Sequence, residues 1–136
     1  MKGLFVDTAG WVACADASAP AHTTFAAARD RWLHEGGVLV TTDYVADETL
    51  ALLRGRLSLR VAETWWRQVE GSSHLRWEFI SLARADKARE LFFRYTDKNF
   101  SFTDCTSFVV MRELKLREVL TLDHHFAQAG FITRPN

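Results

Sequence analysis

The sequence predicts an α/β fold with a mostly parallel central sheet of four to five strands, covered by helices on both faces. Short apolar runs alternate along the chain with longer segments of helical periodicity, which is typical of a parallel sheet. The chain has 136 residues, of which 48% are hydrophobic, and this is enough for one domain with a real core. We therefore expect residues 1–136 to form a single domain without a linker or internal repeat.

The strands are expected where short apolar or alternating runs occur. The first is the buried run Leu4-Phe5-Val6, and Trp77 to Ser81 shows the alternation of a half-buried strand. A run near the C-terminus is expected to form an edge strand. The expected strands are residues 4–6, 38–41, 77–81 and 119–122, with 131–133 at the edge.

Five helical segments separate these runs. The first has Pro20 near its start and Gly36-Gly37 after its end, which are the usual positions of proline and glycine. The last is apolar nearly all round, so we expect it to be buried. The helical segments cover about residues 20–35, 43–56, 58–71, 83–95 and 103–115.

Charge and cysteine content narrow the function. The 17 Lys and Arg residues balance 17 Asp and Glu residues, which argues against a protein that coats nucleic acid non-specifically. Cys14 and Cys105 are isolated, so neither a zinc site nor a disulfide framework is expected. The first apolar run meets Asp7 too early for a signal peptide, and no stretch is long enough for a membrane span. We expect a soluble, cytoplasmic protein without a membrane partner.

Two acids follow expected strands. Asp7 comes directly after the first strand, and Asp123 comes directly after the run 119–122. In open parallel sheets, ligands bind beyond the carboxyl ends of the strands. An aspartate at a strand end also serves as an ordinary helix cap or turn residue, so both interpretations stay open.

Glu48 is expected on the helix 43–56, at the edge of a packed stripe that includes Val45, Thr49 and Leu53. Asp47 falls on the opposite, solvated side. An unpaired carboxylate drawn toward packed surface costs several kcal/mol, and a cation relieves this cost. The alternative is a half-exposed glutamate at the margin of an amphipathic helix.

Asp104 begins the expected helix 103–115. The spacing from Ser101 to Asp104 fits a capping box. Capping and metal binding are compatible, because the helix N-terminus stabilises a carboxylate. Asp97 stands in the preceding loop, where it is either an auxiliary site residue or a solvated acid.

Acids that converge at one edge of the sheet would repel one another. At an effective dielectric near 20, one pair of charges about 4 Å apart costs roughly 4 kcal/mol. A hard divalent ion such as Mg²⁺, bound by carboxylate oxygens, relieves this repulsion. Such ions also activate water and stabilise charge at phosphorus, so the mechanism requires no His, Lys or Tyr base.

Four passages of the chain together resemble one known family. The passages run from Phe5 to Thr8, Thr41 to Leu50, Tyr95 to Cys105 and Leu120 to Phe126. Their order and spacing are similar to those of the PIN-domain ribonucleases, especially the VapC-type toxins of bacterial type II toxin–antitoxin pairs. The resemblance covers essentially the whole chain. It aligns the family's four acids with Asp7, Glu48, Asp104 and Asp123, and a frequent additional acid with Asp97.

The resemblance implies a three-layer α/β/α domain that cleaves RNA with Mg²⁺ or Mn²⁺. It also implies a homodimer and an antitoxin partner that inserts a segment into the active-site groove. The four aligned acids would be metal-binding and catalytic. Thr8, Ser101 and Thr103 would be auxiliary groups that orient ligands or water, although local capping is an equally open reading for them.

Two other functional classes are alternatives to a metal-dependent ribonuclease: another Mg²⁺-dependent enzyme and a non-catalytic binding module. A haloacid-dehalogenase-like phosphatase needs a second Asp two residues after its nucleophile, but Asp7 is followed by Thr8 and Ala9. A phospho-accepting receiver domain needs an acidic pair near the first strand and a lysine after a late strand, and neither is evident. A non-catalytic PIN-like binding module stays open, since a sequence cannot show turnover.

Two further features have competing interpretations. A basic stretch follows the Glu48 helix and either approaches RNA phosphates or forms a solvated face. His124-His125 lacks a matching ligand pair, so we expect it to cap or pack near Asp123 and not to bind zinc. The basic stretch consists of Arg54, Arg56, Arg60 and Arg67.

Overall fold

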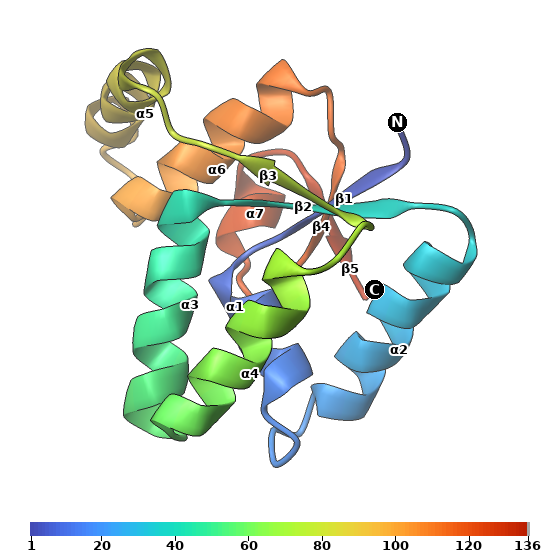
Figure 1. Cartoon of the computed structure of the whole chain (residues 1–136). Coiled ribbons are helices and arrows are strands. Elements are labelled where there is room, and N and C mark those ends of the chain that lie inside the picture. Colours follow the sequence, from blue (N-terminus) through green and yellow to red (C-terminus); the bar gives the residue numbers. More distant parts are fainter. Residues whose placement is uncertain (136) are drawn as a thin grey trace.

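The computed structural model describes residues 1–135 and contains a five-stranded sheet in which every neighbouring pair is parallel (Figure 1). Asn136, the last residue of the expected domain, lies outside the described residues. The strand order β3-β2-β1-β4-β5 confirms the predicted parallel α/β fold. The strands are β1 (Gly3–Val6), β2 (Val38–Thr42), β3 (Leu75–Glu78), β4 (Glu118–Leu120) and β5 (Ile132–Arg134).

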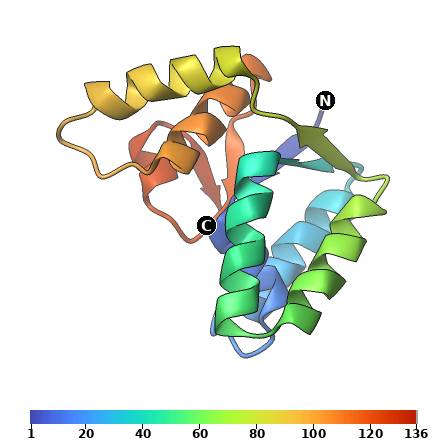
Figure 2. The same cartoon turned by 60° about the vertical axis from the view of Figure 1, so that its left-hand side comes forward.

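Helices cover both faces of this sheet. In Figures 1 and 2, α5 and α6 lie above the sheet and α1, α2 and α4 lie below it, while α3 extends downward from its edge. Among the described helices, none is long and apolar enough to cross a membrane. The helices are α1 (Thr8–Ala15), α2 (His22–His34), α3 (Asp43–Arg56), α4 (Leu59–Glu70), α5 (Leu82–Arg94), α6 (Phe102–Glu113) and α7 (His125–Gln128).

The core forms around the central strand. Every residue of β1 is buried, as expected for a parallel strand with helices on both faces. Helix α6 is buried over most of its length, which confirms the prediction from its nearly all-round apolar sequence. The largest fully buried side chains include Phe5, Phe108, Phe126, Leu4, Leu53 and Met111.

Helix α1 was not predicted. Thr8, Gly10, Trp11, Ala13 and Cys14 are all buried in it, so the helix lacks the exposed polar stripe by which amphipathic helices are found. The short helix α7 was also missed. Helices this short give too few turns for a periodic signal.

Two strands differ from their predicted bounds by more than one residue: β3 is Leu75–Glu78 where 77–81 was expected, and β4 is Glu118–Leu120 where 119–122 was expected. β3 begins two residues earlier than expected because Leu75 pairs with Leu39, which sets the register with β2. β4 ends at Leu120, two residues earlier than expected. Asp123 therefore lies in the turn beyond β4 and does not follow the strand directly.

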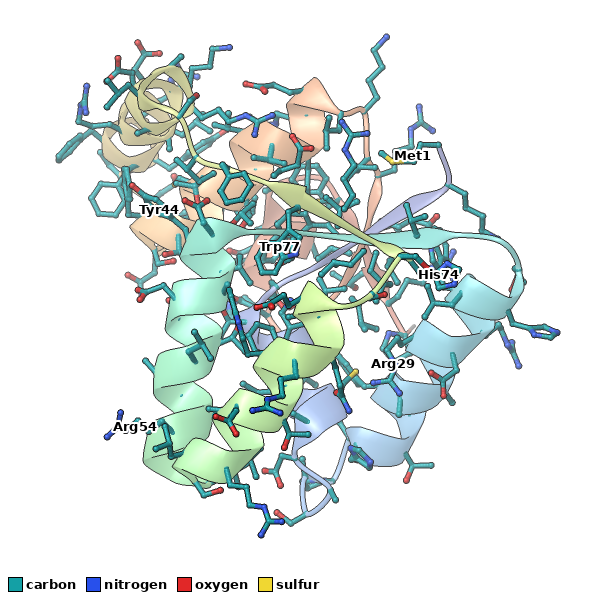
Figure 3. All side chains as sticks on the ribbon, in the orientation of Figure 1. Met1, Arg29, Tyr44, Arg54, His74 and Trp77 are labelled. Atoms are coloured by element: carbon teal, nitrogen blue, oxygen red, sulfur yellow. The ribbon has the colours of Figure 1, made fainter. Side chains whose placement is uncertain are left out.

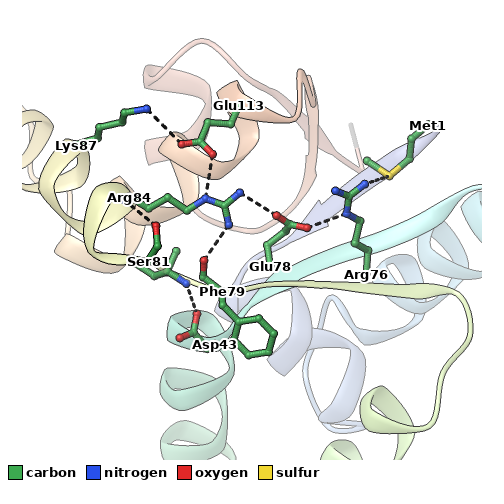
Figure 4. Close-up of polar contacts among 10 residues, drawn as sticks. Met1, Asp43, Arg76, Glu78, Phe79, Ser81, Arg84, Lys87 and Glu113 are labelled. Atoms are coloured by element: carbon green, nitrogen blue, oxygen red, sulfur yellow. Dashed lines mark hydrogen bonds and ion pairs between the residues drawn. The ribbon is translucent and has the colours of Figure 1, made fainter.

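An ion-pair cluster connects α5 with β3 and α6 (Figure 4). Glu78 accepts hydrogen bonds from Arg76 at 2.8 Å and from Arg84 at 2.9 Å. Arg84 also donates to Glu113 at 3.0 Å and to the carbonyl oxygen of Phe79 at 2.9 Å. We call this group the Glu78–Arg84 cluster.

Candidate active site

A pocket of about 320 Å³ opens beyond the carboxyl ends of β1 and β4 and continues between α1 and α3. We call it the acidic pocket. The structure brings together in it the four acids that the sequence singled out, which come from four separate parts of the chain. These acids are Asp7, Glu48, Asp104 and Asp123.

Asp7 directly follows β1 and caps α1. Its Oδ1 accepts a hydrogen bond from the backbone N–H of Gly10 at 2.8 Å. Its Oδ2 accepts one from the hydroxyl of Thr121 at 2.7 Å. The capping role and the position in the acidic pocket therefore coexist, with Asp7 only 5% exposed.

The surroundings of Asp7 disfavour its charged form. Burial raises the pKa of Asp7 from its ordinary value of 3.8 to about 7. The hydrogen bonds from Thr121 and Gly10 lower the pKa, but the negative charges of Asp123 and Asp104 raise it further. Within the described part of the chain, no lysine or arginine forms an ion pair with Asp7. A cation in the pocket would therefore lower this pKa and restore the carboxylate.

Asp104 lies in the first turn of α6 and completes the predicted capping box. Its backbone N–H donates to the hydroxyl of Ser101, and its Oδ2 accepts from the backbone N–H of Ser101, both at 3.0 Å. Burial raises the pKa of Asp104, the hydrogen bond from Ser101 lowers it, and the charge of Asp123 raises it again. Like Asp7, this carboxyl is held in a position that disfavours its charge.

Thr121 links two of the acids and was missed by the sequence reasoning. Its hydroxyl donates to Asp7 and accepts a hydrogen bond from the backbone N–H of Asp123 at 2.8 Å. A signal was present, because in an extended segment residues two apart point to the same side. Thr121 and Asp123 have this spacing.

His125 links the other pair. Its Nδ1 lies 3.1 Å from Asp104 Oδ2 and 3.1 Å from Asp123 Oδ1. Its backbone N–H also donates to Asp123 Oδ1 at 2.9 Å. The expectation that this histidine packs near Asp123 is confirmed, but its contact with Asp104 was not foreseen. Potential ligand atoms of the three residues lie within 4.8 Å of one another.

Glu48 lines the pocket from α3. As expected from the stripe on this helix, Val45, Thr49 and Leu53 are buried, Glu48 is half-buried and Asp47 is exposed. Among residues 1–135, Glu48 forms no hydrogen bond or ion pair of its side chain. It is therefore available for a ligand in the pocket.

The auxiliary residues divide into two groups. Thr8 and Thr103 line the acidic pocket, whereas Ser101 is exposed and caps α6. Asp97 lies outside the pocket, on the surface, where it pairs with Lys98 at 3.1 Å. Ser107 also lines the pocket and was not predicted. It lies on the buried helix α6, where a serine gives no periodic signal.

The residues of the pocket fit a hard divalent cation. Carboxylate oxygens are the ligands that Mg²⁺ and Mn²⁺ prefer. Asp7 and Asp104 have raised pKa values because of burial and mutual repulsion. The hydroxyl oxygens of Thr8 and Ser107 line the same pocket and are buried without a hydrogen-bond partner. Buried polar atoms normally have partners, so these two hydroxyls favour a bound ion with its water.

Comparisons with known proteins agree with this chemistry. The family model of the PIN domain matches residues 4–132. Two Mycobacterium tuberculosis strains have a "23S rRNA-specific endonuclease VapC20" that is 32% identical to this chain over 129 residues, covering 95% of both sequences. The crystal structure of Mycobacterium tuberculosis VapC20, described as a "Sarcin-Ricin loop cleaving toxin", has a TM-score of 0.85 and 30% identity, covering 95% of this chain and 96% of that one. The resemblance to the PIN-domain family is thereby confirmed: this chain belongs to that family and is a homologue of the VapC endonuclease toxins.

Proposed function

We propose that this chain hydrolyses phosphodiester bonds of RNA in the acidic pocket, with Mg²⁺ or Mn²⁺ as cofactor. The observation that carries the proposal is the meeting of four carboxylates in one pocket, where burial and mutual repulsion raise the pKa of two of them. Such an arrangement is costly to the fold without a cation. In a member of a nuclease family, carboxylates that are unfavourable without a cation are suited to bind the metal that catalysis requires.

In this proposal Asp7, Glu48, Asp104 and Asp123 hold the metal. When bound, the ion lowers the pKa of water and stabilises negative charge at phosphorus. Thr121 and the N–H of Gly10 hold the Asp7 carboxyl by hydrogen bonds to both of its oxygens.

Other groups in the pocket and beside it complete the site. His125 keeps Asp104 and Asp123 together. The hydroxyls of Thr8, Thr103 and Ser107 would orient water near the ligands. Ser101 acts through Asp104, whose rotamer it holds by the capping box.

The substrate class follows from the relatives. VapC20 is named for cleavage of 23S rRNA, and its structure for cleavage of the sarcin-ricin loop. We propose that this chain likewise cuts a structured ribosomal RNA loop in the cytoplasm, as the toxin of a type II toxin–antitoxin pair. A cognate antitoxin would block the acidic pocket until it is removed.

We further propose a homodimer. Exposed apolar side chains lie on α5 and on the segment before it, where Phe79 is 65%, Leu82 87% and Phe93 70% exposed. Apolar side chains that cluster on a surface mark interaction sites. Sedimentation of the purified chain tests this, and Leu82→Glu with Phe93→Glu should shift a dimer to the monomer.

The proposed activity is tested by incubating the purified chain, freed of antitoxin, with total RNA in Mg²⁺, Mn²⁺ or EDTA. Sequencing of the product ends identifies the bond that is cut. We expect cleavage with either metal and none with EDTA. Asp7→Asn and Asp104→Asn should each reduce cleavage by at least about a thousandfold, as expected for ligands of an essential metal.

The matched control is a pair of substitutions on one helix. Glu48→Gln should reduce cleavage, whereas Asp47→Asn removes the neighbouring, exposed carboxylate and should leave it unchanged. Unchanged activity in Asp7→Asn or Asp104→Asn would exclude the proposed site. RNA that is bound but never cut by the wild-type chain would instead favour a non-catalytic binding module.

A further inference from the structure

The acidic pocket continues as a groove between α1 and α3. On α3, Glu48, Leu52 and Arg56 line it and are four residues apart, so they occupy one face at successive turns. On the other side, Val12 of α1 and Asp16, the residue directly after this helix, line it with the same spacing. At a rise of 1.5 Å per residue, Arg56 lies about 12 Å along the helix axis from Glu48.

The chemistry of the groove changes along its length. Carboxylates line the end near the sheet, and the middle is lined by Val12, Ala13 and Leu52. At the far end Arg56 is the one basic side chain among the described residues that line the groove. Asp16, at the same end, has its carboxylate engaged by the N–H and hydroxyl of Ser18, at 3.0 Å and 2.6 Å.

The structure separates the arginines of the basic stretch. Arg67 forms an ion pair with Glu63 at 3.5 Å. The side chain of Arg54 points outward from the lower part of α3 (Figure 3) and does not line the groove, and neither does Arg60. In the described part of the chain Arg56 forms no ion pair or hydrogen bond through its side chain. An unpaired guanidinium is thus available beside a row of carboxylates and apolar side chains.

We propose that Arg56 binds a backbone phosphate of the RNA, roughly three nucleotides from the bond that is cut. The proposal rests on the nuclease function above. At roughly 3.4 Å per nucleotide, which is the rise of one strand along the axis of a double helix, about 12 Å spans three or four stacked nucleotides. The apolar middle of the groove would face the bases or riboses that lie between. A guanidinium binds phosphate bidentately, so Arg56 sets the register and direction of the RNA strand.

The test compares Arg56→Ala with Arg54→Ala. Both residues are exposed and lie in the last turn of α3, so both substitutions remove the same net charge and the same interaction with the helix dipole. RNA binding is measured in the Asp104→Asn background, so that the RNA is not cut, with the RNA segment that surrounds the cleavage site. We expect Arg56→Ala to weaken binding about tenfold and Arg54→Ala less than twofold, as for a phosphate contact against an uninvolved charge.

The salt dependence is a second measurement that a merely structural effect would not reproduce. Loss of one phosphate contact to a single strand makes the slope of log affinity against log salt shallower by about 0.7. We expect this for Arg56→Ala and not for Arg54→Ala. Arg56→Lys, which keeps the charge, should retain most of the slope.

The position of the contact is tested by replacing single phosphates of the RNA with neutral methylphosphonates. One replacement, about three nucleotides from the cut, should weaken binding to the Arg54→Ala chain but not to the Arg56→Ala chain. Equal affinities and slopes for the two alanine variants would overturn the proposal. This outcome is separate from a failure of the nuclease function, which would appear as absence of cleavage by the wild-type chain whatever the affinities.

Discussion

The acidic pocket and the Glu78–Arg84 cluster surround their carboxylates with opposite charges: carboxylates around Asp7, and arginines around the partly buried Glu78. Burial alone would raise the pKa of Glu78, but hydrogen bonds from Arg76 and Arg84 lower it below its ordinary value. Burial also raises the pKa of Asp7, and there the neighbouring charges are other carboxylates. Arginine side chains thus neutralise Glu78 where β3 meets α5, whereas among the described residues no lysine or arginine pairs with Asp7 in the acidic pocket. Uncompensated charge of this kind is concentrated at functional sites.

The largest effect is expected from removing the uncompensated charge. In the folded metal-free chain the pKa of Asp7 is about 7 instead of 3.8, so the folded state binds more protons than the unfolded state between these values. Stability therefore falls as the pH rises from about 4 to 7, by up to about 4 kcal/mol. Asp7→Asn has no carboxyl to ionise at this position, so it should be more stable than wild type in EDTA at pH 8. Urea unfolding measures the difference.

The same variant should show less than half of that gain at pH 5, where the carboxyl is largely protonated in the folded chain. Mg²⁺ should stabilise the wild-type chain at pH 8 by about 3 kcal/mol at a hundred times its Kd, and Asp7→Asn should lose most of this effect. If Asp7→Asn were less stable than wild type in EDTA at pH 8, the charge of Asp7 would not be the uncompensated one that distinguishes the acidic pocket from the Glu78–Arg84 cluster.

In the Glu78–Arg84 cluster, neutralising the carboxylate is expected to lower the stability of the chain, not to raise it. Glu78→Gln removes the charge that binds Arg76 and Arg84 and should destabilise the chain by about 1–3 kcal/mol at pH 7. Because the pKa of Glu78 is lowered by folding, its contribution is present above about pH 4.5 and is lost as the pH falls through the folded-state pKa. Urea unfolding at pH 7 and at pH 3 measures the difference.

Glu63→Gln is the matched control for the cluster. Its pair with Arg67 is largely exposed, and surface pairs contribute little. A loss of stability in Glu63→Gln as large as in Glu78→Gln would show that the two Glu78 hydrogen bonds carry no special weight.

A smaller effect, on the rate of cleavage, is expected from removing the hydrogen bond that Thr121 donates to Asp7. Thr121→Val keeps the shape of a buried side chain but removes the hydrogen bond that lowers the pKa of Asp7. We expect cleavage to fall about tenfold at pH 7 and to recover at higher pH, as for a group whose pKa is raised further. The pH profile of cleavage is the measurement, and a pH-independent loss would show a purely structural role for Thr121.

The smallest effect is expected from Asp97. The sequence leaves open whether Asp97 is an auxiliary site residue or a solvated acid, and in the structure it is exposed and pairs with Lys98. Asp97→Asn should therefore change the cleavage rate by less than about threefold, as usual for a surface charge. If Asp97→Asn reduced the cleavage rate as much as Glu48→Gln does, Asp97 would have an auxiliary role in catalysis after all.

Local sequence patterns were sufficient for most elements and for the placement of the acids. The helix that carries Glu48 was expected at residues 43–56, the same bounds as α3, because its stripe and its turn signals agree. The hydrogen bonds that connect the acids were not predictable from local sequence patterns. Thr121 and Asp7 are 114 positions apart, so their hydrogen bond depends on the neighbouring positions of β1 and β4, which only the strand order gives. Helix α1 was missed because burial all round removes the periodicity by which helices are found.

The close contact of α1 with β4 has a practical consequence. A Cβ atom at Gly10 would lie 2.2 Å from the carbonyl oxygen of Leu120, so a single added methyl group would push the helix away from the strand. The hydrogen bond between Asp7 and Thr121 spans this contact. Gly10→Ala would thus disturb the link between Asp7 and Thr121 while every acid, and the net charge, stayed the same.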